Sequence, residues 1–182
     1  MPQNKLKMST VFFDIDTQID FMLPTGALYV PGAENIIPIV AALNRQAPIV
    51  ISSMCAHSED DLEFPIYGHH CVVGTVGQQK PAATLLNDPA RQFFMPKQEL
   101  NVFSNPDLLP LLKRLNADSY VVYGVVTEIC VQFAAFGLLE TGKPVTLVTD
   151  AIRSLDDSAG AETIARFTEA GGRLVTSQDL LA

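Results

Sequence analysis

The sequence predicts an α/β fold, a three-layer α/β/α sandwich built on a mostly parallel six-stranded sheet. Short apolar runs alternate with longer stretches of helical periodicity along the chain. The runs are continuously apolar rather than alternating, which is typical of parallel strands covered by helices on both faces. The 182 residues contain no internal repeat, low-complexity tract or linker, so we expect residues 1–182 to form a single domain.

Six apolar runs are the predicted strands, because each is short and bounded by polar or turn-forming residues. They are residues 10–14, 48–53, 92–95, 119–125, 145–149 and 173–176. A long irregular insert is expected between the second and third strands, from about residue 54 to residue 92.

The first two predicted helices each contain a proline that limits where the helix begins. Residues 32–44 place apolar side chains at helical spacing, and Pro38 is tolerable there near the first turn, where backbone donors are unpaired. In residues 106–115, Pro110 indicates that the regular helix begins late, with Asp107 as its cap.

Three further helices are predicted from caps and stops. Residues 127–141 end at Gly142, a residue that commonly terminates helices. Ser154 with Asp157 is expected to cap the next helix, which ends before a pair of glycines, and Ser177 is expected to cap a last short turn.

Composition and charge exclude several classes of protein. Twelve Lys and Arg against twenty Asp and Glu give a net charge of −8, which argues against nucleic acid or an anionic membrane as the main partner. The apolar content of 48% and charged content of 18% exclude a disordered chain. Three cysteines exclude a full disulfide framework, and no apolar run resembles a signal or a membrane span. We therefore expect a cytoplasmic protein that acts on a small molecule.

Ligand sites of parallel sheets lie outside the C-terminal ends of the strands. That rule selects residues 14–20, 54–57, 96–97 and 126–130, which follow four of the predicted strands. We therefore expect the chemistry of this chain in these four segments.

Cys130 is the strongest candidate for chemistry in these segments. It closely follows the strand 119–125, and with Thr127 as N-cap it occupies the third helical position. A thiol there faces the positive end of the helix, which favours the thiolate, and nearby backbone N–H groups can hold a developing oxyanion. The alternative is an inert buried cysteine on an apolar helix, since Ile129 and Val131 flank it.

Asp16 and Lys97 also stand after predicted strands. A carboxylate beside a thiol can take its proton and return it to a leaving group, and a lysine beside both favours the thiolate. Taken singly, each residue has an ordinary alternative: Asp16 as a turn or capping residue and Lys97 as a solvated surface side chain.

The insert gathers residues that can bind a metal. Cys55, His57, Glu63 and the run His69-His70-Cys71 all fall within it, and it contains every histidine of the chain. These residue types are zinc ligands, although their spacing matches no closed structural zinc motif. The alternative is a polar loop whose histidines bond to the backbone.

Six motifs together resemble one known family. FFDIDTQIDF, GALYVPGAENI, SSMCAHSEDD, HHCVVGTVGQ, PKQELNVF and GVVTEICVQFAA follow one another in this order. They resemble the isochorismatase-like cysteine hydrolases, which include nicotinamidases and related amidohydrolases, and the resemblance runs from about residue 10 to residue 151. It implies a Rossmann-like topology and hydrolysis of an amide or carbamoyl C–N bond in a small molecule.

The resemblance also implies a Cys–Asp–Lys triad. Asp16 falls on the family's catalytic acid, Lys97 on its lysine and Cys130 on its nucleophile. A cis peptide bond between Val125 and Val126 is implied, with an oxyanion hole made by the backbone N–H groups of Val126 and Cys130. The implied reaction passes through a thioester on Cys130 that water then hydrolyses.

Further family features concern the substrate pocket and the assembly. Phe21 falls on an aromatic residue that lines the substrate pocket of nicotinamidases, and Tyr67 and Phe103 fall near two others. Relatives often form dimers or tetramers, so the resemblance also implies a homo-oligomer.

One departure from the family concerns its metal site. Metal-binding members carry Asp-x-His, and in this chain Cys55 stands at the Asp position. His57 and His70 match ligand positions, and Glu63 can match a third. Cysteine also binds zinc, so two outcomes stay open. The chain either keeps a site for zinc or another divalent metal, with an affinity or metal choice that differs from the family's, or has lost the site.

Two other functions compete with this interpretation. The run Asp14-Ile15-Asp16-Thr17 resembles the start of haloacid-dehalogenase-type phosphatases, in which Asp14 would be the nucleophile and Asp16 the acid, with Mg²⁺. Gln18 stands where that pattern has threonine, and Cys130 would have no role. The second alternative is a non-catalytic binding module on the same fold, against which the complete triad argues.

Overall fold

The computed structural model describes residues 10–182, so the first nine residues of the predicted domain lie outside the described residues. Six strands form one sheet in the order β3-β2-β1-β4-β5-β6, and all neighbouring strands run parallel. The strands are β1 (Thr10–Ile15), β2 (Ile49–Cys55), β3 (Gln92–Lys97), β4 (Ser119–Val125), β5 (Val145–Arg153) and β6 (Arg173–Val175). The predicted six-stranded α/β fold is confirmed.

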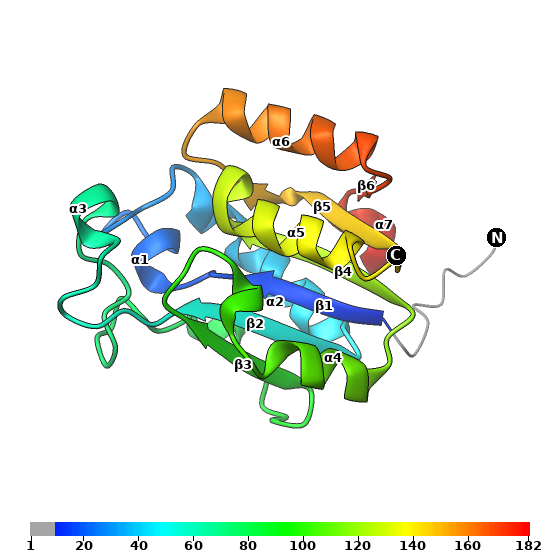
Figure 1. The fold of residues 1–182 in the computed structure, drawn as a ribbon, viewed down its shortest axis with the longest axis horizontal. Helices are drawn as coiled ribbons and strands as arrows, with labels where there is room; N and C mark the ends of the chain where they lie inside the picture. The colour runs from blue at the N-terminus through cyan, green and yellow to red at the C-terminus, as the bar shows by residue number, and fades with distance from the viewer. Residues whose placement is uncertain (1–9) are drawn as a thin grey trace.

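Helices cover both faces of the sheet, as Figure 1 shows. One face carries α2 (Ile37–Gln46) and α7 (Ser177–Leu181), and the other carries α4 (Leu108–Leu115), α5 (Gln132–Leu139) and α6 (Asp157–Glu169). The connecting segments contain the short helices α1 (Ile19–Met22) and α3 (Phe64–Tyr67), the 3₁₀ turns η1 (Ala33–Ile36), η2 (Ala82–Thr84) and η3 (Val102–Ser104), and the π-helical turn η4 (Thr127–Val131). Within residues 10–182, no helix is long and apolar enough to span a bilayer.

The prolines limit two helix starts as the sequence predicts. The predicted stretch 32–44 divides into η1 and α2, with Pro38 in the first turn of α2. Helix α4 begins immediately after Asp107, which is its N-cap residue.

Two predicted caps are wrong by one or two residues. Helix α6 begins after Asp156, rather than at Ser154 or Asp157, because the Asp156 carboxylate accepts hydrogen bonds from two backbone N–H groups of the first turn. Helix α7 begins after Thr176, rather than with Ser177 as cap, because Thr176 forms a capping box with the aspartate three residues later.

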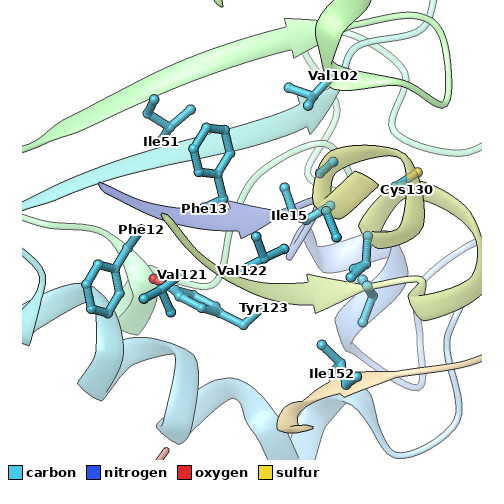
Figure 2. Packing of buried hydrophobic residues seen from close by; sticks show 14 of the residues in the cluster. Phe12, Phe13, Ile15, Ile51, Val102, Val121, Val122, Tyr123, Cys130 and Ile152 are labelled. Atoms are coloured by element: carbon cyan, nitrogen blue, oxygen red, sulfur yellow. The ribbon is translucent and has the colours of Figure 1, made fainter. Parts of the chain in front are cut away.

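The two central strands are buried on both faces. Figure 2 shows Phe13 of β1 packed toward Ile51 on one side of the sheet, and Phe12 packed near Tyr123 on the other. The rings of Phe12 and Tyr123 meet edge-to-face with centroids 6.2 Å apart. This packing makes β1 and β4 a rigid platform for the residues that follow them.

The strand order reverses between β1 and β4, and this reversal fixes where a site can form. The chain proceeds from β1 outward to β2 and β3, then returns to the other side of β1 as β4. Gly124 near the end of β4 has φ +119°, and a Cβ there would lie 2.1 Å from the carbonyl oxygen of Ile15. Glycine therefore allows β1 and β4 to stay together to their C-terminal ends, where ligand sites of such sheets form.

Candidate active site

The three residues of the predicted triad lie together at the C-terminal edge of the sheet. Asp16 follows β1, Lys97 ends β3, and Cys130 lies in η4 after β4. The Lys97 Nζ lies 2.8 Å from Asp16 Oδ2 and 3.7 Å from Cys130 Sγ. All three side chains are buried. Three strand ends that are far apart in the sequence thus meet at one ammonium group.

The Asp16 carboxylate is fixed by its own backbone and by β2. Asp16 has φ 48°, a left-handed conformation that few residues other than glycine adopt. Ser53 Oγ donates a hydrogen bond of 2.7 Å to Asp16 Oδ1, and the backbone N–H of Asp16 donates to the Ser53 carbonyl at 3.2 Å. Sequence analysis did not assign Ser53, although its place at the end of the strand beside β1 is a usable signal.

Burial and neighbouring charges shift the pKa values of Asp16 and Lys97. Burial, together with the negative charge at Cys55, raises the pKa of Asp16 above its usual value, while Lys97 opposes the rise. Burial opposes the charge of Lys97, but Asp16 and the two neighbouring thiols raise its pKa well above the usual range. Lys97 therefore stays an ammonium, and Asp16 binds a proton more readily than an exposed carboxylate does.

Cys55 is a second thiol in the site, and sequence analysis gave it no part in the triad. Its Sγ lies 3.2 Å from Lys97 Nζ and 3.7 Å from Asp16 Oδ2. Hydrogen bonding with Cys130 is the largest influence that lowers the pKa of Cys55, and the same contact raises the pKa of Cys130. The two thiols thus compete for one position as the thiolate beside Lys97.

The turn that carries Cys130 differs in one respect from the expectation. The peptide bond between Val125 and Val126 is cis, as the family resemblance implied. Thr127 is not the N-cap: the turn is π-helical, and the carbonyl of Val126 accepts the N–H bonds of Ile129 and Val131. The buried Thr127 hydroxyl has no hydrogen-bond partner among the described residues.

Three residues of the insert and β2 form a candidate metal site. Cys55 Sγ and one ring nitrogen each of His57 and His70 lie within 4.8 Å of one another. His57 Nδ1 bonds to Asp61 Oδ2 at 2.9 Å, and its buried Nε2 has no hydrogen-bond partner within residues 10–182. His70 Nδ1 bonds to the carbonyl of Gly68 at 2.8 Å. Bonds of this kind orient metal-binding histidines, so the donor set fits a zinc-type ion.

Glu63 lies beside this cluster rather than in it. Its Oε2 is 3.9 Å from His57 Nε2. Burial opposes a charge on His57, but Cys55 and Asp61 raise its pKa to about 9. The donor atoms that lie together are thus those of Cys55, at the family's Asp position, and of the two histidines, while Glu63 reaches the cluster at His57.

A narrow pocket opens at Cys130. Its cavity volume is about 20 Å³, and Phe21 and Tyr67 line it where the resemblance placed them. The other lining residues are Leu28, Cys55, Glu63, His70, Leu100, Val125, Val126, Ile129 and Leu155. The structure does not bring Phe103 here, because its ring packs against Gly137 and lines a separate groove of about 620 Å³ between η3, α5 and α6.

Asp14 lies in the core, away from this pocket. Its side chain is fully buried, and Oδ2 is 2.8 Å from Lys80 Nζ and 2.8 Å from Asn44 Nδ2. Thr17 Oγ1 donates to Asp14 Oδ1 at 2.6 Å. The phosphatase alternative is wrong, because its nucleophile would be enclosed in a hydrogen-bonded network.

Comparison with known proteins agrees with the fold described above. The family model for the isochorismatase domain matches residues 10–179. The probable hydrolase YcaC of Escherichia coli (strain K12) is 32% identical to this chain over 77 residues. That alignment covers 42% of this chain and 37% of the length of YcaC.

Solved structures extend the similarity over nearly the whole chain. PnC1 from L. infantum in complex with nicotinate is 27% identical, with a TM-score of 0.84 and 94% of each chain covered. The pyrazinamidase of Pyrococcus horikoshii in complex with zinc is 23% identical, with a TM-score of 0.82 and coverage of 92% and 99%. The second similarity is one of fold alone.

Proposed function

The chain belongs to the isochorismatase family of hydrolases, and on that premise we propose that it cleaves an amide or carbamoyl C–N bond of a small molecule. The nucleophile is Cys130, with Asp16 as acid and base and Lys97 as the stabilising cation. One observation carries this proposal: a single ammonium, Lys97 Nζ, contacts both the carboxylate of Asp16 and the sulfur of Cys130. Of these three residues, Cys130 lines the pocket.

The reaction proceeds in two halves. Asp16 accepts the proton of the Cys130 thiol, and the sulfur attacks the carbonyl carbon of the substrate while Lys97 compensates the negative charge. The backbone N–H groups of Val126 and Cys130 receive the oxyanion. The C–N bond breaks as Asp16 gives its proton to the departing nitrogen. Water then attacks the thioester, with Asp16 as base, and releases the acid and the free thiol.

The pocket favours a small, largely apolar substrate. Phe21, Leu100 and Ile129 supply an apolar lining, and the cavity is close to the size of one water molecule, so these side chains must move apart to admit a ligand. The L. infantum relative was solved with nicotinate, a pyridine carboxylate. Pyridine carboxamides such as nicotinamide are therefore the substrate class that we propose first.

We further propose that Cys55, His57 and His70 hold zinc or a similar divalent metal beside the pocket. The unpartnered Nε2 of His57 and the thiol of Cys55 support it, because both are donors that zinc accepts. When bound, such an ion supplies a Lewis-acidic anchor for a donor atom of the substrate. Elemental analysis of protein purified without chelators tests this: about one zinc per chain is expected, and it should be lost in His57→Ala. No stoichiometric metal after reconstitution would remove the metal proposal and leave the triad untouched.

The proposed activity is tested by a screen of small amides with ammonia release as the readout. The panel contains nicotinamide, carbamoyl compounds and ureido acids, and Cys130→Ala serves as the matched control. We expect at least one amide to be hydrolysed, with a loss of about 10⁴-fold or more in the control. Hydrolysis by Cys130→Ala at the rate of the unchanged protein would refute the proposed mechanism.

A further inference from the structure

Two thiols of the active site contact one ammonium group. Lys97 Nζ lies 3.2 Å from the sulfur of Cys55 and 3.7 Å from that of Cys130. The two sulfur atoms come from different strand ends, and both contact the Lys97 ammonium group. All three cysteines of the chain are free.

The same pocket gives access to both sulfur atoms. Cys55 and Cys130 both line it, although each side chain is otherwise buried. A small uncharged oxidant that enters the pocket therefore meets two sulfur atoms at once. A thiolate is the form that reacts with oxidants, and a positive charge such as Lys97 stabilises it.

Cys71 provides a contrast within the same chain. It is fully buried, and its sulfur contacts the carbonyl of Gly77 rather than a cation. Burial raises the pKa of Cys71 far above its usual value, so it stays a neutral thiol. The chain thus contains two cysteines beside a stabilising positive charge, Cys55 and Cys130, and a third cysteine, Cys71, that is unreactive.

We propose that Cys55 and Cys130 form a reversible disulfide in the presence of hydrogen peroxide, and that this bond switches the enzyme off. The bond requires the two side chains to turn toward each other until their sulfur atoms are about 2.05 Å apart. It removes the nucleophile, and it also removes Cys55 from the candidate metal site.

The chemistry balances in two steps. The thiolate of one cysteine attacks an oxygen of hydrogen peroxide, so that an S–O bond forms, the O–O bond breaks, and hydroxide leaves and is protonated to water. The second thiol loses its proton, and its sulfur attacks the sulfenic acid. An S–S bond forms, the S–O bond breaks, and the hydroxide leaves with that proton as a second water. The two thiols lose two electrons, and the peroxide gains them.

The pair also protects the nucleophile. A sulfenic acid with no thiol beside it is oxidised further to sulfinic acid, which dithiothreitol does not reduce. With Cys55 in contact, the disulfide forms first and a thiol reductant restores both cysteines. The proposal that the switch controls activity rests on the proposed function, but the cross-link itself is measured by mass and needs no substrate.

The experiment treats the purified protein with hydrogen peroxide at neutral pH and then blocks remaining thiols with N-ethylmaleimide in denaturant. Peptide mapping without reduction should show a cross-linked pair of peptides that contain Cys55 and Cys130, lighter by two hydrogen atoms. Cys71 should be alkylated. Hydrolysis of the best amide should fall by about tenfold or more and return after dithiothreitol.

Cys55→Ser is the decisive variant, and Cys55→Ala is the second in case the first folds poorly. Both should lack the cross-link, and in both peroxide should convert Cys130 to a sulfinic acid that dithiothreitol leaves unchanged. A cross-link to Cys71, or sulfinic Cys130 without a cross-link in the unchanged protein, would overturn the proposal. Equal recovery of amide hydrolysis after dithiothreitol in the unchanged protein and in the Cys55 variants would overturn it as well. Failure of the amide screen would leave the cross-link result standing.

Discussion

Two aspartate–lysine pairs lie close together at the end of β1, and they share one geometry. Asp14 Oδ2 is 2.8 Å from Lys80 Nζ, and Asp16 Oδ2 is 2.8 Å from Lys97 Nζ. All four side chains are buried. The pair distance and the burial therefore do not distinguish the structural pair from the pair that we propose to be catalytic.

The remaining contacts of each pair do distinguish them. Thr17, Asn44 and Ser52 direct hydrogen bonds at the Asp14 carboxylate, so neutral donors occupy its oxygen atoms. The second pair instead contacts two ionisable thiols. A buried ion pair with complete neutral hydrogen bonding fixes the fold, whereas one with reactive neighbours beside a pocket can transfer protons.

Asp16→Asn is expected to have the largest effect on activity. The amide cannot accept the thiol proton, so kcat/KM for the best amide should fall by about 10²–10⁴-fold. Ser53 stays in place to hold the side chain. Initial rates of ammonia release measure the effect, and a loss of less than about threefold would contradict the role of Asp16 as acid and base.

Asp14→Asn should affect stability instead. The change leaves the buried Lys80 ammonium without its counter-ion, which costs about 3–5 kcal/mol of the free energy of unfolding. Urea denaturation measures this loss. The kcat/KM of the folded fraction should change little, because the Asp14 carboxylate contacts Lys80 and neutral donors rather than Lys97 or Cys130. Lost activity with unchanged stability would show that the two pairs had been assigned the wrong way round.

Tyr123→Phe gives the smallest effect and depends on pH. The Tyr123 hydroxyl donates to Asn44 Oδ1 at 2.5 Å, and its loss should cost about 1 kcal/mol near neutral pH. Burial, with the nearby Asp14 charge, raises the pKa of Tyr123 well above its ordinary value of 10.0. Tyr123 thus contributes stability that is complete below pH 10 and is lost as the pH rises toward the folded-state pKa.

The measurement compares urea denaturation of the two proteins at about pH 8 and about pH 11. Above pH 10 the unfolded chain releases a proton that the folded chain keeps, so Tyr123 lowers stability by about 1.4 kcal/mol for each pH unit. The advantage of the unchanged protein over Tyr123→Phe should therefore shrink at high pH. An advantage that is the same at both pH values would contradict the buried, neutral hydroxyl.

The sequence predicted most of the fold because continuous apolar runs mark parallel strands directly. All six strands appeared, and the strand-end rule selected the segments that contain Asp16, Lys97 and Cys130. Helix caps were less predictable. Several polar residues next to a helix start can act as the N-cap. The geometry of the turn decides between Ser154, Asp156 and their neighbours.

The contacts among the site residues could not be predicted from spacing alone. The register of β2 against β3 places Cys55 opposite Lys97, and no local pattern encodes that register. The same limit explains Phe103, whose motif position suggested the pocket while η3 turns its ring toward Gly137. It also explains why the ion pair of Lys80 with Asp14 was not predicted, because Lys80 lies in a part of the insert with no regular pattern.

Identification of the cysteine that carries the acyl group would test the proposed mechanism most directly. The best amide is mixed with the protein, the reaction is quenched in acid during turnover, and the thioester is located by peptide mass spectrometry. The expected result is an acyl group on the peptide that contains Cys130, and none on the peptide that contains Cys55. An acyl group on Cys55, or steady turnover with no thioester on Cys130, would contradict Cys130 as the nucleophile of the Asp16–Lys97 pair.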